Sequence, residues 1–277
     1  NTAVGFSSLK VNTTGSSNVA VGFESLRSNT TAIGNSALGY EALELNTTGA
    51  VNTAMGYRAL KSNTTAGDNT AVGLCALHSN TTGTNNVAVG NNSLKTQTTA
   101  EGNTAIGTDT LCTITSSAGG NTAVGQKALE DDTTGFYNTA VGSLSLCQNT
   151  EGSCNVAIGR EALRNNTTAS NNTAVGKSAL NANTTGTDNV AIGRNTLSAN
   201  TTASQNTAIG TEAVLKTTTG ADNTGIGFIS LCDNTTGSNN TAIGAFALRK
   251  NTTGTDNTSV GRCSGFTNTT GGCLVAL

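Results

Sequence analysis

The sequence predicts an all-β fold, a parallel β-solenoid (β-roll) of sixteen 17-residue coils, and three observations carry this prediction. One motif recurs along the whole chain: Asn, then Thr or Val, Ala, Val or Ile, and Gly, followed by a Leu and by Asn-Thr-Thr. Its period is too short for a helix pair or a propeller blade, which need about 34 and about 40 residues. Its short β-favouring triplets are separated by Gly and Asn, and the 277 residues include no Pro.

The copies follow one another so closely that we expect a single repeat domain over residues 1–277. Coils that stack at about 4.8 Å each would make a rod roughly 75–80 Å long. The copy at 103–120 has 18 residues and a degenerate second half, and residues 274–277 follow the last copy as a short terminal segment. The sixteen copies begin at Asn1, Asn18, Asn35, Asn52, Asn69, Asn86, Asn103, Asn121, Asn138, Asn155, Asn172, Asn189, Asn206, Asn223, Asn240 and Asn257.

We number the positions within a coil as slots 1 to 17, beginning at that Asn. Slot 1 is Asn and slot 5 is Gly in all sixteen copies, slot 4 is always Val, Ile, Leu or Met, and slot 9 is Leu in fourteen. Stacking turns each slot into a ladder of like residues, and we expect the slot 4 and slot 9 ladders to form a narrow core. Strand alternation then places the slot 3 Ala on the opposite face.

A strand that is apolar or small on both faces is usually covered on both faces. This pattern favours packing against sister chains. The alternative is a flattened solenoid whose exterior Ala only avoids crowding. Open coil ends would expose unpaired strand edges, which predicts either caps or head-to-tail joining into a filament.

Composition argues against several functions. The net charge is −2 and only 11% of residues are charged, so nothing points to nucleic acid. No apolar run approaches the roughly 18 residues of a membrane span, so we expect no membrane insertion. The single His78 has no fixed acidic partner for a triad, no CxxC spacing suggests zinc, and Gly recurs as a turn ladder rather than a phosphate loop. We therefore expect no enzyme and no catalytic, cofactor or metal site.

The Asn-Thr-Thr triplet in slots 12 to 14 forms an N-x-T acceptor, which predicts N-glycosylation if the protein is secreted. In the alternative reading the triplet is only a turn ladder. The turn-ladder reading is favoured, because the Thr pair persists in the copies where slot 12 is Gln97, Asp132 or Thr217 and no acceptor Asn is present. Stacked Thr also resembles the faces of β-solenoid ice-binding proteins. The candidate glycosylation sites are Asn12, Asn29, Asn46, Asn63, Asn80, Asn166, Asn183, Asn200, Asn234, Asn251 and Asn268.

Seven cysteines suggest an oxidising compartment, so we expect a secreted, extracellular protein. Cys147 and Cys154 share one coil, Cys263 and Cys273 share another, and each pair is a candidate local disulfide. The remaining cysteines, Cys75, Cys112 and Cys232, lie coils apart and are interpreted as thiols rather than inter-chain bridges.

Two copies, NTAMGYRALKSNTTAGD (Asn52–Asp68) and NTAIGAFALRKNTTGTD (Asn240–Asp256), resemble the NTAIGYxAL and NTTG repeats of tail-fibre proteins. They are similar, more loosely, to the head β-rolls of trimeric autotransporter adhesins. The resemblance implies an extracellular fibre with a left-handed β-roll, often a homotrimer, and no catalytic residues. We expect a non-enzymatic structural fibre or filament subunit. The alternatives are the shaft of an adhesin or tail fibre, whose partners include surface carbohydrate, and an ice-binding protein.

Overall fold

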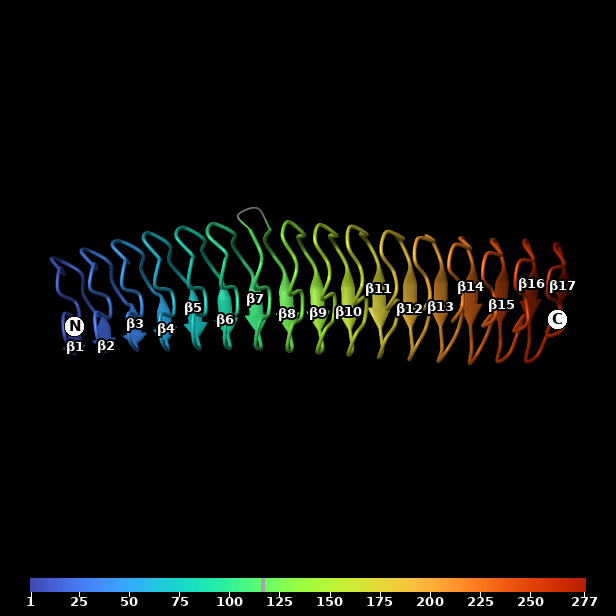
Figure 1. Ribbon diagram of the computed structural model, residues 1–277, viewed down its shortest axis with the longest axis horizontal. Coiled ribbons are helices and arrows are strands. Elements are labelled where there is room, and N and C mark those ends of the chain that lie inside the picture. Colours follow the sequence, from blue (N-terminus) through green and yellow to red (C-terminus); the bar gives the residue numbers. More distant parts are fainter. Residues whose placement is uncertain (116–117) are drawn as a thin grey trace. The chain divides into compact units, whose positions relative to one another are not determined.

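The protein is an all-β parallel β-solenoid, as the repeat predicts. The computed structural model describes residues 1–115 and 118–277; residues 116 and 117, in the degenerate half of the irregular coil, lie outside the described residues. Each coil contributes one short strand, and no helix occurs in the described residues (Figure 1). Paired residues are one 17-residue copy apart, as in Thr2 opposite Val19. The predicted fold class is therefore confirmed.

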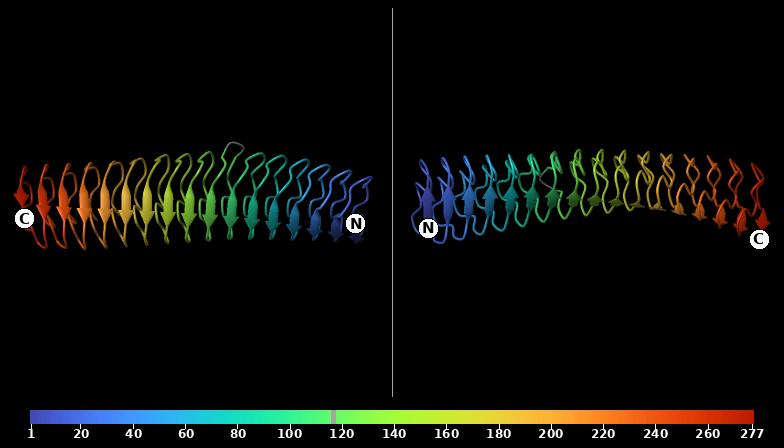
Figure 2. Two further views of the ribbon diagram at one scale, coloured as in Figure 1. Left: turned by 180° about the vertical axis from the view of Figure 1, so that it is seen from behind. Right: turned by 90° about the horizontal axis from the view of Figure 1, so that it is seen from below.

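The chain divides into two compact units, Asn1–Tyr137 and Asn138–Leu277. Within each unit the strands run parallel and side by side (Figure 2). The strands of the first unit are β1 (Thr2–Val4), β2 (Val19–Val21), β3 (Ser36–Leu38), β4 (Thr53–Met55), β5 (Thr70–Val72), β6 (Val87–Val89), β7 (Thr104–Ile106) and β8 (Thr122–Val124).

The second unit continues the same pattern with one strand per coil and a final two-residue strand. Its strands are β9 (Thr139–Val141), β10 (Val156–Ile158), β11 (Thr173–Val175), β12 (Val190–Ile192), β13 (Thr207–Ile209), β14 (Thr224–Ile226), β15 (Thr241–Ile243), β16 (Thr258–Val260) and β17 (Val275–Ala276).

The strand faces are the reverse of our prediction. The slot 3 Ala points inward and is buried, as at Ala174 and Ala208, whereas the slot 4 side chain points outward. Ile158 and Ile209 in slot 4 are 41% and 37% exposed. The prediction that slot 4 joins the core was therefore wrong. The coil is so narrow that only a methyl group fits beneath the strand, and the bulky β-branched residue is placed outside.

The core ladder of slot 9 is confirmed. From the second coil on its leucines are fully buried, as at Leu163 and Leu180, and so are most of the small residues of slots 3 and 8. These leucines adopt a left-handed backbone, with φ of 49° at Leu163 and 50° at Leu180. That conformation is costly for residues other than Gly. We infer that burial of the Leu side chain offsets the cost in the coils that carry Leu here, since burying this side chain is worth about 1.5–3 kcal/mol.

Gly is required in slot 5 because of the backbone of the next coil. Gly159 has φ of 127°, a conformation that L-residues rarely adopt. A Cβ at Gly159 would lie 2.7 Å from the carbonyl carbon and oxygen of Gly176 in the following coil. Any side chain there would push neighbouring coils apart, which explains why the slot never varies.

Two ladders of Asn side chains close each coil from inside. In slot 1, Asn35 Oδ1 accepts a hydrogen bond from the backbone N–H of Asn52 at 2.8 Å, and Asn35 Nδ2 donates to the Gly49 carbonyl at 2.9 Å. In slot 12, Asn46 also donates to the Gly49 carbonyl at 2.9 Å. The slot 15 carbonyl thus receives two amide donors from opposite ends of the coil. These side chains satisfy buried polar groups in a low-dielectric interior, where an unpaired group is expensive.

Candidate functional surfaces

The outer face of the strand ladder carries a continuous column of exposed or half-buried apolar side chains in each unit. Slot 4 residues are exposed or half-buried in every coil, and exposed ones such as Leu38, Met55, Ile106 and Ile192 range from 38% to 47%. Slot 2, usually Thr or Val, lies on the same face and is mostly half-buried. Each unit therefore carries two parallel columns, one mainly of Val and Ile, with Leu38 and Met55 in the first unit, and one mainly of Thr. Soluble monomers rarely expose contiguous apolar surface of this extent.

A column of aromatic rings lies beside this face in the first unit, in slot 6. Phe6, Phe23, Tyr40 and Tyr57 stack with centroids 5.4, 5.0 and 5.2 Å apart and planes within 13° of parallel. All four are exposed, by 39% to 69%. This column was not predicted, although the 17-residue spacing of these four residues is visible in the sequence.

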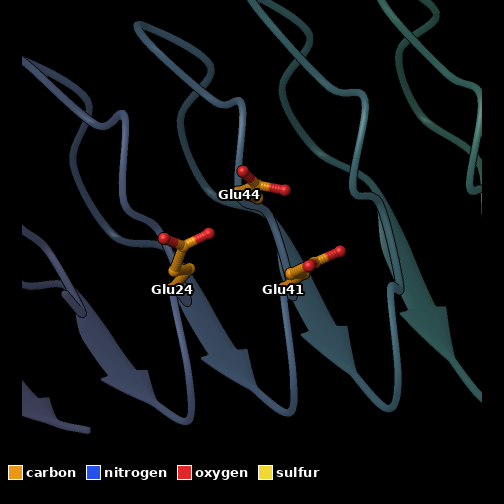
Figure 3. A group of neighbouring side chains, drawn as sticks. All are labelled: Glu24, Glu41 and Glu44. Carbon is orange, nitrogen blue, oxygen red and sulfur yellow. The ribbon is translucent and has the colours of Figure 1, made fainter. Parts of the chain in front are cut away.

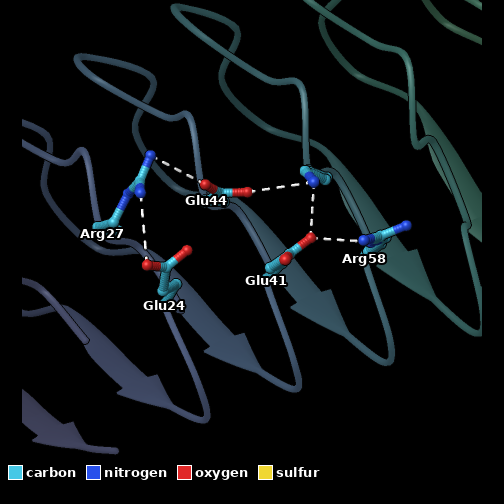
Figure 4. Close-up of polar contacts among 6 residues, drawn as sticks. Glu24, Arg27, Glu41, Glu44 and Arg58 are labelled. Carbon is cyan, nitrogen blue, oxygen red and sulfur yellow. Dashed lines mark hydrogen bonds and ion pairs between the residues drawn. The ribbon is translucent and has the colours of Figure 1, made fainter. Parts of the chain in front are cut away.

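A network of charges occupies slots 7 and 10 of the same coils. Arg27 lies between Glu24 and Glu44, and Arg58 lies beside Glu41 (Figure 4). The contacts are Arg27–Glu24 at 3.4 Å, Arg27–Glu44 at 3.0 Å and Arg58–Glu41 at 2.8 Å. The ion pairs thus link side chains both within one coil and between neighbouring coils. This network too could have been found by reading the sequence in its 17-residue register.

The three glutamates of this network could in principle hold a metal ion, because one carboxylate oxygen of each lies within 4.8 Å of the others (Figure 3). Three cations already neutralise them, however. Arg27 and Arg58 make the three contacts given above. In addition, Lys61 Nζ lies 2.6 Å from Glu41 Oε2 and 3.4 Å from Glu44 Oε2. The arrangement is therefore better described as a neutral ion-pair network than as a metal site.

The ion pairs shift the pKa of Glu41. Burial by itself would raise this pKa, but hydrogen bonds from Lys61, Arg58 and Tyr40 outweigh it, so the pKa of Glu41 lies below its ordinary value. The same hydrogen bond to Glu41 raises the pKa of Lys61. Both groups therefore stay charged near neutral pH, and neither is poised for proton transfer.

The predicted glycosylation sites lie inside the coil. Nine of the eleven acceptor Asn side chains, among them Asn63 and Asn183, are fully buried; Asn12 and Asn268 are partly accessible. The Nδ2 of Asn63 donates to Asn46 Oδ1 at 2.8 Å and to the Ala66 carbonyl at 2.9 Å, so both of its hydrogens are in use. A glycan on these nine residues would require the coil to open, which argues against the glycosylation prediction for them.

The Thr pair that follows divides between two environments. Thr64 in slot 13 donates its hydroxyl to the Thr81 carbonyl at 3.1 Å and is half-buried. Thr65 in slot 14 is exposed. Slot 14 therefore forms an outward column of Thr.

The cysteines do not form the predicted bridges in the structure. Cys154 is an exposed, reduced thiol and so forms no disulfide with Cys147, which is buried. Cys263 and Cys273 are both exposed and reduced. Burial raises the pKa of Cys232, as expected for an unreactive thiol beside the core.

Comparisons with known proteins leave the fold and these surfaces as the basis for any functional argument. No protein-family model matches the chain, and no curated protein matches it. None of the residues 1–115 and 118–277 belongs to a helix that could cross a membrane.

Proposed function

We propose that the chain is a non-enzymatic structural subunit of an extracellular fibre, and that the outer strand face packs against copies of the same chain. The observation that supports this proposal is the slot 4 column, which keeps a large aliphatic residue outside in every coil. A surface that only had to remain soluble would carry polar residues there. Eight such side chains in each unit leave several hundred Å² of apolar surface, which favours burial in an interface.

A second copy suits this face better than an unrelated partner does. The column repeats at the coil spacing, so another copy offers an identical column with the same period. Like faces then match in register along their length, as the self-complementary interfaces of symmetric oligomers do. The flanking slot 2 hydroxyls provide a polar rim.

The remaining features agree with a structural role. Slot 1 and slot 12 amides are occupied by hydrogen bonds within the stack, and the charged network neutralises itself. The Asn of slot 1 and the Gly of slot 5, which hold each coil to the next, do not vary. The alternative is the shaft of an adhesin or tail fibre, which would use the same interface. The two differ in whether a recognition domain is attached to the shaft.

Charge substitution on the proposed interface tests self-association. We expect the combined variant Ile158→Lys, Ile192→Lys and Ile209→Lys to shift the protein to monomer in light scattering coupled to gel filtration. A matched control places three lysines at Thr168, Thr202 and Thr219, which are exposed slot 14 residues of the same coils. The control should keep the native oligomer. An unchanged oligomer in the slot 4 variant would place the interface elsewhere.

Ice binding is a second candidate, because Thr in slot 2 and Val or Ile in slot 4 form a regular hydroxyl and methyl array on one face. It requires that this face stay free of partners. Inhibition of ice recrystallisation by the monomeric protein would support ice binding. Ice crystals that grow as fast as in buffer alone would exclude it.

A further inference from the structure

The charged side chains of the second unit are segregated by slot. All eight of its lysines and arginines occupy slots 6, 10 and 11, in the segment that follows the strand of each coil. Three of its seven acidic residues lie in slots 7 and 11 of that segment, and the other four lie in slots 14 and 17, which lead into the next strand. We call slots 6, 7, 10 and 11 of the coils in residues 155–273 the basic edge.

The side chains of the basic edge meet one another along the stack. Arg194 in slot 6 pairs with Glu212 in slot 7 of the next coil at 3.0 Å. The guanidinium of Arg249 in slot 10 lies 5.8 Å from the centroid of the Phe246 ring in slot 7. Six of the eight cations are exposed and two are half-buried. The edge is therefore one surface that a ligand in solution can reach.

Most of the positive charge on the basic edge is not neutralised. Each of its three acids pairs with one cation: Arg160–Glu161 at 2.9 Å, Arg194–Glu212 at 3.0 Å and Lys216–Asp233 at 2.7 Å. In residues 1–115 and 118–277, no carboxylate forms an ion pair with the other five cations, which are Arg164, Lys177, Arg249, Lys250 and Arg262. At about 4.8 Å per coil, this surplus extends over roughly 30 Å.

The first unit carries no such surplus. Its six lysines and arginines are outnumbered by nine acidic residues. The net charge of −2 for the whole chain therefore conceals a basic surface on the second unit. Clustered charge of one sign attracts ligands of the opposite sign, whatever the net charge of the molecule.

Two phenylalanine rings position a cation near one end of the basic edge. The Arg249 guanidinium lies 5.8 Å from the ring centroids of both Phe246 and Phe266, and Lys250 Nζ lies 5.2 Å from that of Phe266. Arg249 Nε is buried and has no hydrogen-bond acceptor. The guanidinium is thus held by rings rather than by a carboxylate. A guanidinium held in this way keeps its charge and its terminal N–H donors for an oxyanion.

We propose that the basic edge binds an acidic polysaccharide, whose carboxylate or sulfate groups recur along an extended chain. The sign of the charge selects an anion, and the length of the edge suits a chain better than a small anion. One sugar unit of an extended chain is about as long as one coil spacing, so its charges can meet cations on successive coils. Half-buried amide and hydroxyl side chains between the cations, such as Asn195 and Ser198, suit the sugar hydroxyls.

A single-stranded nucleic acid fits the basic edge less well. Proteins that bind such strands combine phosphate contacts with bases stacked on open aromatic faces. Here Arg249 lies against both Phe246 and Phe266, and Phe246 also meets Phe228 edge-on, with centroids 5.4 Å apart and planes at 85°. Few ring faces remain for bases. The proposal uses neither slot 2 nor slot 4, so it goes beyond self-association and does not depend on it.

Fluorescence anisotropy with labelled oligomers of equal length tests the proposal on the full chain. The probes are oligogalacturonate, a heparin fragment, neutral dextran and oligothymidylate. We expect saturable binding of at least one acidic sugar, about tenfold tighter than dextran and weakened by added salt, which screens opposite charges. The two acidic probes distinguish carboxylate from sulfate. Equal binding of dextran, or no saturable binding of either acidic sugar, would overturn the proposal. Oligothymidylate binding tighter than both would assign the edge to nucleic acid and overturn it too.

A double variant and a matched control locate the site. Lys250→Gln with Arg262→Gln removes two exposed cations of the basic edge, and we expect about tenfold weaker binding of the acidic sugar. Lys10→Gln with Lys95→Gln removes the same charge from exposed positions of the first unit and should leave binding unchanged. Equal losses in both would mean that overall charge attracts the polymer, which would overturn the proposal. Circular dichroism checks folding, and oligomer mass reports separately on the slot 4 interface.

Discussion

Replacing Asn183 by alanine tests how much the buried amide ladder contributes to stability. Its Nδ2 donates to Asn166 Oδ1 and to the Gly186 carbonyl, both at 2.9 Å, and its Oδ1 accepts from Asn200 Nδ2 at 2.8 Å. The Gly186 carbonyl retains a second donor, Asn172 Nδ2 at 2.9 Å, so it stays satisfied in the variant.

The variant therefore leaves two polar groups without a partner: Asn166 Oδ1 and one hydrogen of Asn200 Nδ2. An unsatisfied buried group costs about 1–3 kcal/mol, so we expect Asn183→Ala to lower the free energy of unfolding by about 2–5 kcal/mol. Asn183→Thr should cost about half as much. At the natural threonine of this slot, Thr217 Oγ1 accepts from the next amide, Asn234 Nδ2, at 3.1 Å.

Urea unfolding followed by circular dichroism, at one fixed protein concentration, measures the cost. Amide hydrogen exchange in the same coils shows whether the loss is local, as expected in a repeat protein whose coils contact mainly their neighbours. The surface control is Asn91→Ala, which alters an exposed side chain and should change stability by less than about 0.5 kcal/mol. If Asn183→Ala costs no more than this control, the amide ladder does not hold the coils together.

Three further predictions follow from the same structure. Gly159→Ala should destabilise the protein by at least about 2 kcal/mol in thermal unfolding, because of both clash and backbone strain. Gly34→Asn should be nearly neutral, since its added Cβ would meet nothing closer than 3.7 Å and Asn tolerates the left-handed backbone of this slot, as at Asn85 with φ of 58°. The lowered pKa of Glu41 stabilises the fold above its ordinary value of 4.5, and this contribution is lost as the pH falls through the folded-state pKa. Calorimetry should accordingly show that Glu41→Gln costs more stability at pH 7 than at pH 3, and an equal cost at both would count against the network. Mass spectrometry of the protein from its native source should find no glycan on Asn200, and a glycopeptide there would mean that glycosylation precedes folding.

The fold could be predicted from the sequence because the stack repeats a single local solution. The invariant Gly of slot 5 marks a position that needs one backbone conformation, and the frequent Leu of slot 9 marks a position that is buried. Both can be recognised in the sequence before the rest of the structure is known. Which face of the strand points into the core could not be predicted in the same way. Slots 3 and 4 are both apolar, and alternation says only that they face opposite sides. The width of the coil decides which side is inside, and width is a property of the closed coil.

The candidate surfaces were only partly predictable. The Asn of slot 12 reads equally well as an outward acceptor or as an inward ladder, because the same amide serves both roles. Its burial depends on the carbonyl of slot 15, which the sequence does not display. The aromatic column and the charged network lie in variable slots, so they disappear in a consensus and emerge only when successive coils are aligned.

The central claim is that the outer strand face is covered by copies of the same chain. Sedimentation equilibrium of the unmodified protein over a wide concentration range tests this most directly. The account predicts a particle whose mass is a small whole multiple of 27.5 kDa and which persists on dilution. A single species of 27.5 kDa at every concentration would contradict it, and would mean that the slot 4 column faces water or a different partner.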